Sequence, residues 1–326
     1  MQTLERWIAA MSMPHALGDV FKSVADCAIE ISVALRMAAL SGDSGVAGNV
    51  NVQGEAQKRL DVVSNEIFLR RGAASSVLAA MVSEELDDVV LVADAPVDAR
   101  YALVFDPLDG SSNLDVNGAV GSIFSVLDVG KSRSVVAADV LQSGNRQVAA
   151  GYMLYGPATV MVLTTGKSVA VFGLDEAEAE FVVVDGNVRI PPETSEFAIN
   201  ASRREQWYAP TRRYIDDCLA GKNGPLGKSY NMRWCAAMVA DLHRILCRGG
   251  IFLYPEDEGT RAKGGRLRLL YEANPMSMIV EAAGGASSTG AQRILDVVPD
   301  HLHQRIGVIM GSREEVERAV SYYASS

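Results

Sequence analysis

The chain has 326 residues, of which 48% are hydrophobic and 21% are charged, so it can bury a large core and is not a disordered protein. Its formal net charge of -10 at pH 7 argues against non-specific binding to nucleic acid, which requires a basic surface. The longest uncharged stretch, residues 148–166, contains Gly156 and Pro157 and predicts two buried strands around a turn, not a membrane span. We therefore expect neither a nucleic-acid partner nor a membrane partner.

The N-terminus and the cysteines predict a cytoplasmic protein. Residues 1–19 carry charges early and lack the basic start and the long apolar core of a secretion signal. The chain has four cysteines, and their spacing is not that of paired metal ligands. We interpret them as reduced thiols, which are typical of the cytosol.

The first half of the chain combines two helices with a series of short strands. Apolar residues three and four apart predict a helix over residues 18–41, and a Gly- and Asn-rich loop separates it from a second predicted helix over residues 54–72. Short runs rich in β-branched and aromatic residues follow, and the turn residues between them favour a mostly antiparallel or mixed sheet. These predicted strands are residues 77–85, 101–109, 122–129, 147–155, 158–165, 168–174 and 181–186.

Helices and strands alternate after the composition changes at residues 190–197. Asn274 and Pro275 are typical of a helix start. The predicted helices are residues 210–221, 233–248, 274–285 and 312–324, and the predicted strands are residues 250–255, 267–272 and 305–312. The sequence therefore predicts an α/β protein with two fused mixed-sheet domains, residues 1–190 and residues 191–326.

The segment VFDPLDGSSNLD, residues 104–115, is the first candidate for chemistry. Asp106 stands at the carboxyl end of an apolar run, where open α/β sheets commonly build their sites. A turn shaped by proline and glycine can bring its carboxylate next to that of Asp109, and two such carboxylates repel each other unless a cation lies between them. The amides and hydroxyls of Gly110, Ser111 and Ser112 would suit a phosphate beside that cation. A simple Asx turn explains this motif equally well when it is taken alone.

Further acidic residues stand at the ends of two other predicted strands. Glu84 and Glu85 end the run 77–85, and adjacent strand residues point to opposite faces, so one can ligate a metal while the other reaches a water or a second ion. Glu272 ends the run 267–272 just before a predicted helix. A solvated loop is the simpler interpretation of the glutamate pair alone. Taken together, the three acidic strand ends predict an oxygen-ligand site for Mg²⁺ or a similar hard cation.

Other charged residues carry weaker signals. Glu55 and Asp61 are six residues apart and do not share a helical face, so surface positions are the simpler interpretation. Arg233 is predicted at a helix start and is either a bidentate phosphate ligand or an ordinary surface charge. Arg266 and Arg268 lie on one face of a predicted strand, where one of them contacts a second phosphate or forms a salt bridge.

Five segments of the chain resemble the class I fructose-1,6-bisphosphatase family and occur in the same order. They are VSEE, DPLDGSSN, GGIFLYP, LRLLYEANPM and AGGASSTG, and the similarity runs from about Gly54 to the C-terminus. The resemblance implies a layered αβαβα sugar-phosphatase fold and a homotetramer. It also implies Mg²⁺-dependent hydrolysis of the 1-phosphate of D-fructose 1,6-bisphosphate, a reaction of gluconeogenesis and of the reductive pentose phosphate cycle. Two or more cations per subunit are implied, with Mn²⁺ or Zn²⁺ as alternatives to Mg²⁺.

The resemblance also assigns roles to individual residues. The implied metal ligands are Glu84, Asp106, Leu108 through its carbonyl, Asp109 and Glu272. The residues implied to position and deprotonate the attacking water are Asp61 and Glu85, and Glu55 is implied as a further catalytic residue on a mobile loop near the metals. The implied contacts to the reacting phosphate are Asp109, Gly110, Ser111 and Ser112. The implied contacts to the sugar and its distal phosphate are Asn200, Tyr254 and Arg266, with Arg233 reaching in from a neighbouring subunit.

Several positions near the implied sugar site depart from the family pattern. Trp234 replaces a tyrosine, Arg266 replaces a lysine, and no tyrosine follows Asn200 by three residues. Sedoheptulose 1,7-bisphosphate, as sole or additional substrate, therefore stays open as an alternative. A non-catalytic sugar-phosphate sensor is a more remote alternative, because it expects a lost metal carboxylate and every matched position here is acidic. The region before residue 48 matches the family poorly, so we do not predict inhibition by AMP.

Overall fold

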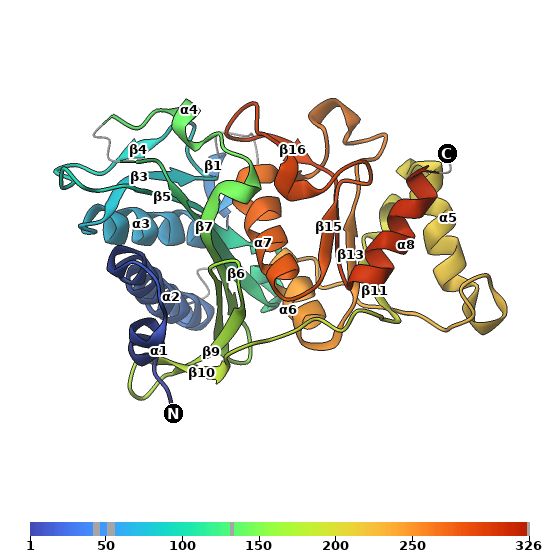
Figure 1. Ribbon diagram of the computed structural model, residues 1–326, viewed down its shortest axis with the longest axis horizontal. Helices are drawn as coiled ribbons and strands as arrows, with labels where there is room; N and C mark the ends of the chain where they lie inside the picture. Colours follow the sequence, from blue (N-terminus) through green and yellow to red (C-terminus); the bar gives the residue numbers. More distant parts are fainter. Residues whose placement is uncertain (42–45, 51–55, 131–133, 325–326) are drawn as a thin grey trace.

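The protein folds into five layers that alternate between helices and β-sheets (Figure 1). The computed structural model describes residues 1–41, 46–50, 56–130 and 134–324. The N-terminus lies with the first layer of helices and the C-terminus with the last. This arrangement confirms the predicted layered αβαβα fold of the α/β class with mixed sheets. The division into two domains near residue 190 stays a prediction.

Three N-terminal helices cover one face of an eight-stranded sheet. The helices are α1 (Leu4–Ala10), α2 (His15–Ser41) and α3 (Arg59–Ala73). The strands are β3 (Leu78–Ser83), β4 (Val90–Leu91), β5 (Tyr101–Asp109), β6 (Val120–Asp128), β7 (Gln147–Tyr155), β8 (Thr159–Thr164), β9 (Val169–Asp175) and β10 (Glu180–Asp185). Their order in the sheet is β10-β9-β8-β7-β6-β5-β3-β4, and β3 with β5 is its parallel pair. The predicted strands of the first half are therefore present.

A central layer of two helices separates this sheet from a second, five-stranded sheet (Figure 1). The central helices are α6 (Met238–Arg248) and α7 (Asn274–Ala282), and the outer helices are α5 (Ala209–Leu219) and α8 (Arg313–Ala324). The second sheet consists, in spatial order, of β12 (Asn231–Met232), β11 (Glu196–Ile199), β13 (Ile251–Tyr254), β17 (Val308–Gly311) and β15 (Ala286–Ser288). Apolar side chains of both sheets pack around α6 and α7, so one core joins the two halves of the chain.

Helices on both faces explain why the strands of the large sheet have continuous apolar sequences. Every residue of β5 is buried. On one face Phe105 stacks on Phe68 of α3, with ring centroids 4.6 Å apart. On the other face Val104 packs with Leu270 and Tyr271. A strand buried on both faces needs no alternation of apolar and polar residues, and this one carries its terminal acidic residues into the interior.

Shorter elements connect these layers. β1 (Val46–Val50) pairs with β2 (Ala56–Lys58), and β14 (Leu267–Arg268) pairs with β16 (Arg305–Ile306). The short helical turns are α4 (Ala137–Val140), η1 (Ser111–Val116), η2 (Gly144–Arg146), η3 (Ala201–Gln206), η4 (Gly221–Asn223), η5 (Arg261–Lys263), η6 (Leu269–Ala273) and η7 (Ile294–Asp296). Among the helices of the described residues, none has the length and apolar character needed to span a membrane. The four cysteines are free thiols, two of them buried.

Two predicted helices are shorter than expected. The helix predicted over residues 54–72 begins at Arg59, because residues 56–58 pair as strand β2. The helix predicted from Arg233 begins at Met238, so the prediction that Arg233 stands at a helix start is wrong. The intervening residues form a loop that carries Ala236 at a φ of +59°, which a helix does not allow.

The strand predicted over residues 267–272 is also wrong over most of its length. β14 ends at Arg268, and Glu272 lies in the helical turn η6 that leads into α7. Every residue of this turn is buried. A short, continuous apolar run does not distinguish a buried strand from a buried helical turn, because both lack a polar face.

Candidate active site

The acidic pair at the end of β5 is brought together by an irregularity in the strand. Residues three apart on a regular strand point to opposite faces. β5 pairs with β6 at Asp106 and again at Asp109, but the register shifts by one residue between them. Leu108 N donates to Asp106 Oδ1 at 3.0 Å, and the Ser122 hydroxyl donates to the Pro107 carbonyl at 2.8 Å. The extra residue turns the two carboxylates toward the same side.

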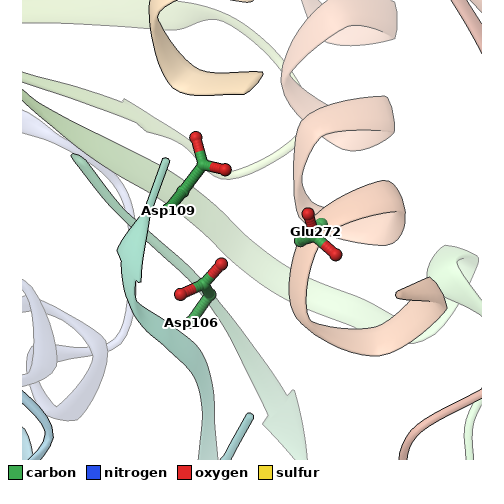
Figure 2. Close-up of side chains that lie close together, drawn as sticks. All are labelled: Asp106, Asp109 and Glu272. Carbon is green, nitrogen blue, oxygen red and sulfur yellow. The ribbon is translucent and has the colours of Figure 1, made fainter. Parts of the chain in front are cut away.

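Glu272 joins this pair from a distant part of the chain. One carboxylate oxygen from each of Asp106, Asp109 and Glu272 lies within 4.8 Å of the others, and Figure 2 shows Glu272 facing the two aspartates from its helical turn. Arg268 N donates to Glu272 Oε2 at 2.6 Å, and Val239 N, at the start of α6, donates to Asp109 Oδ2 at 2.8 Å. All three side chains are buried, and backbone N–H groups at the end of β14 and at the start of α6 hold two of them in place.

The burial of these carboxylates sets their electrostatics. Desolvation is the larger cause and repulsion from neighbouring carboxylates the smaller one. Together they raise the pKa of Asp109 to about 7, the pKa of Glu272 to about 8 and the pKa of Asp106 well above its usual range. The cluster is fully ionised near neutral pH only if a cation offsets its charge, and its all-oxygen donors fit a hard divalent cation.

A fourth carboxylate, that of Glu84, lies beside the cluster and is paired with an arginine. Glu84 directly follows β3. Arg268 Nη1 is 2.7 Å from Glu84 Oε1 and 4.0 Å from Glu272 Oε2, and all three side chains are buried. Of the two interpretations left open for Arg268, the salt bridge is the one that the structure shows. The guanidinium is therefore a fixed positive charge inside an acidic site.

A cavity of about 330 Å³ opens onto the acidic cluster. Its lining includes Asp61, Glu85, Gly110, Ser111 and Ser112 together with the four carboxylates described above. Asp61 is buried in the first turn of α3, so the surface position that the sequence alone favoured is wrong. The structure thus brings the acidic strand ends and the hydroxyl-rich turn to one cavity.

Gly110 allows the chain to turn sharply between the acidic cluster and the serines. Its φ is +76°, in the left-handed region, and a Cβ at this position would lie 2.4 Å from the Cβ of Ala237. η1 begins immediately afterwards, which leaves the first backbone N–H groups of this turn free of helical partners. Such N–H groups are suited to bind an anion.

Replacing Gly110 with Ala should therefore disturb the site. We expect a loss of stability of about 1–3 kcal/mol from the left-handed backbone, and a fall in activity of about tenfold or more because Ala237 must move. Thermal unfolding and steady-state kinetics measure the two effects. Gly221→Ala is the matched control, because its φ is +70° and no heavy atom lies within 4 Å of the added Cβ. Equal activity losses in both variants would contradict the role of the Ala237 contact.

The residues assigned to the sugar end line the same cavity, with one exception. Asn200 lies at the start of η3, Tyr254 ends β13, and Arg266 is exposed just before β14. Arg233 is not among the described residues that line the cavity. It is exposed, and its backbone N donates to Phe197 O at 2.8 Å. A contact from Arg233 to a neighbouring subunit therefore stays a prediction.

The sequence also drew attention to Glu55, Arg268 and Trp234. Glu55 lies outside the described residues. Arg268 and Trp234 line the cavity, and the sequence had named Arg268 only as a phosphate or salt-bridge candidate and Trp234 only as a departure from the family pattern. A signal for Arg268 was available, because an arginine inside a buried apolar run needs a carboxylate partner. Trp234 stands in a loop without periodicity, so only the family resemblance, and no local pattern, indicated its place near the implied sugar site.

Buried carboxylates beside a glycine- and serine-rich turn in a layered α/β fold favour a phosphoric monoester hydrolase. Residues 3–186 match the N-terminal domain of fructose-1-6-bisphosphatase, and residues 190–324 match its C-terminal domain. The chain belongs to the fructose-1,6-bisphosphatase family, which is metal-dependent in general.

Solved structures agree with this assignment. The holo form of Leishmania major fructose-1,6-bisphosphatase is 34% identical, with a TM-score of 0.92 over 99% of this chain and 98% of that chain. The apo form of the same enzyme is 33% identical, with a TM-score of 0.86 over 99% of both chains. The similarity therefore extends over both halves of the protein.

Proposed function

We propose that this enzyme hydrolyses the 1-phosphate of D-fructose 1,6-bisphosphate and releases D-fructose 6-phosphate and inorganic phosphate, with Mg²⁺ as its cofactor. The observation that carries the proposal is the acidic cluster beside the turn Gly110–Ser112, in a chain whose two halves both match the family. The proposed pathways are gluconeogenesis and the reductive pentose phosphate cycle. The proposed compartment is the cytoplasm.

We propose that the acidic cluster binds two or more Mg²⁺ ions. Its oxygen donors favour a hard cation, so we expect Mg²⁺ as the metal in preference to Mn²⁺ and Zn²⁺. When bound, the cations would neutralise phosphate charge and lower the pKa of a water molecule. The proposed ligands are Glu84, Asp106, the carbonyl of Leu108, Asp109 and Glu272.

The chain's own residues would bind the phosphate and accept the proton. The backbone N–H groups and hydroxyls of Gly110, Ser111 and Ser112 would hold the phosphate oxygens, because this turn faces the cavity beside the cluster. Asp61 and Glu85 line the same cavity and would orient the attacking water and accept its proton. We propose that Glu55 is a further catalytic residue near the metal ions. No covalent intermediate on the enzyme is required.

The distal phosphate and the sugar would bind in the same cavity. Asn200, Tyr254 and Arg266 are part of its lining, and arginine suits bidentate contact with a phosphate. The exposed position of Arg233, outside the cavity of its own chain, supports a contribution to a neighbouring site in a homotetramer. Light scattering of the purified protein tests the tetramer, and a monomeric enzyme with full activity would contradict this role.

A comparison of two substrates tests the proposed reaction. Purified protein with Mg²⁺ is assayed on fructose 1,6-bisphosphate and on sedoheptulose 1,7-bisphosphate, and the sugar product is identified by phosphorus NMR. We expect a higher kcat/KM for the six-carbon substrate and fructose 6-phosphate as its product. A higher kcat/KM for the seven-carbon substrate would overturn the proposed substrate. Binding of sugar phosphates without release of phosphate would instead indicate a sensor.

Stabilisation by Mg²⁺ should grow as the pH rises. The pKa of Asp109 is raised to about 7 and that of Glu272 to about 8. Protonation of these two carboxylates therefore stabilises the metal-free fold. This stabilisation is fully present below about pH 4 and is lost as the pH rises through 7 to 8. Mg²⁺ binds the ionised carboxylates and must displace those protons. The increase in Tm on adding Mg²⁺ should therefore be larger at about pH 8 than at about pH 6. An increase that is independent of pH would contradict this linkage.

A further inference from the structure

Trp234 lies on a loop, residues 233–237. Three hydrogen bonds connect this loop to other parts of the chain. Asn113, which follows the phosphate-binding turn, donates its side-chain amide to Cys235 O at 2.9 Å. Cys235 N donates to Asp241 Oδ1 of α6 at 2.9 Å, and Arg233 N donates to the Phe197 carbonyl of β11 at 2.8 Å. The backbone of Trp234 therefore has a defined position relative to the turn that faces the cluster.

The indole ring of Trp234 is equally constrained. It stacks on Phe252 with ring centroids 5.9 Å apart and an interplanar angle of 11°, and it lies 5.9 Å from the ring of Tyr254. Phe252 is itself buried in the core of β13. The indole is half-buried and lines the cavity in company with Tyr254 and Arg266. It therefore forms a stiff aromatic part of the cavity lining.

We propose that Trp234 is a specificity-determining residue, whose indole admits a six-carbon ketose bisphosphate and disfavours a seven-carbon one. The inference rests on the proposed function and deepens it. Both substrates share the reacting end, so the turn Gly110–Ser112 and the acidic cluster treat them alike. The seven-carbon sugar is longer by one hydroxymethylene group, which must be accommodated between the reacting end and Arg266.

An aromatic side chain that is held in place limits the size of the bound sugar, whereas a flexible side chain can move aside. The loop bonds and the stack on Phe252 prevent Trp234 from moving aside without breaking contacts. The flat indole also offers apolar surface to the C–H groups of a bound sugar. A single extra carbon against such a side chain changes kcat/KM by roughly 10- to 200-fold.

Kinetics of Trp234→Ala and Trp234→Phe test the proposal. We expect the ratio of kcat/KM for sedoheptulose 1,7-bisphosphate to that for fructose 1,6-bisphosphate to rise about tenfold or more in Trp234→Ala, and less in Trp234→Phe. A ratio within twofold of the wild type in both variants would overturn the inference and leave the proposed function intact. A wild-type protein that hydrolyses neither sugar would overturn the proposed function itself.

Fluorescence keeps the proposal testable if Trp234→Ala does not fold. The chain has three tryptophans, and Trp7 and Trp207 are buried outside the cavity. Adding fructose 6-phosphate with Mg²⁺ to the wild type should change the tryptophan emission. The change should disappear in Trp234→Phe and persist in the matched control Trp7→Phe. Persistence of the change in Trp234→Phe would show that the sugar does not contact this ring, and would overturn the proposal.

Discussion

Asp109→Asn is expected to abolish Mg²⁺-dependent phosphate release while the fold stays intact. The substitution removes one charge from a cluster in which three carboxylate oxygens lie within 4.8 Å of one another. The amide oxygen can still accept the hydrogen bond from Val239 N, so the start of α6 keeps its partner. Loss of a proposed metal ligand that is also a proposed phosphate contact should lower kcat by about 10³-fold or more.

The stability of Asp109→Asn separates a chemical role from a structural one. The raised pKa of Asp109 means that its charged form destabilises the metal-free fold near pH 8. A neutral amide should therefore leave the Tm without metal unchanged or higher, and should reduce the rise in Tm that Mg²⁺ produces. Asp115→Asn, an exposed position on η1, is the matched control and should keep full activity. Near-normal turnover of Asp109→Asn would refute the assignment of this metal ligand.

Arg268→Met is expected to destabilise the metal-free enzyme and to slow catalysis. The side chain pairs with Glu84 at 2.7 Å in a buried site, so its removal leaves an uncompensated buried carboxylate. Breaking a buried ion pair on one side costs about 3–5 kcal/mol. Because the guanidinium also lies 4.0 Å from Glu272, the acidic cluster should shift and kcat should fall by about 10²-fold.

Denaturant unfolding with and without Mg²⁺ measures this effect. Mg²⁺ should restore part of the lost stability, because it offsets the same negative charge. Arg268→Lys keeps the charge and should recover more stability than activity, since it lacks the planar fork. Arg100→Met is the surface control, because its ion pair with Asp128 is exposed and should contribute little. An Arg268→Met variant as stable as the wild type would show that Arg268 does not compensate the buried negative charge of Glu84.

Much of the fold follows from local sequence pattern. The strands β5 to β9 coincide closely with apolar runs between turn residues, and α7 begins at the predicted Asn274. These elements are predictable because burial on both faces of the sheet selects the same apolar residues along each strand. The limits of α3 and α6 are less predictable, because loops such as 233–237 are held by tertiary hydrogen bonds and not by local preference.

The site is predictable only in part. Asp106, Asp109 and Glu84 are predictable because each is an acidic residue at the end of an apolar run. The family resemblance added Asp61, which periodicity alone had placed on the surface. Glu272 was predicted at the right residue but on the wrong element. The pairing of Arg268 with Glu84 connects residues that are far apart in the chain, so no local pattern specifies it.

The sequence by itself determined which residues are acidic, where the strands run, and to which family of folds and hydrolases the chain is similar. These properties follow from local periodicity and from motifs that lie within single segments. Only the tertiary structure decided which carboxylates share a site, which arginine pairs with them, and which aromatic side chain of the loop before α6 lines the cavity. Those outcomes depend on contacts between β5, η6 and the loop before α6, and such contacts arise only when the five layers pack around a common core.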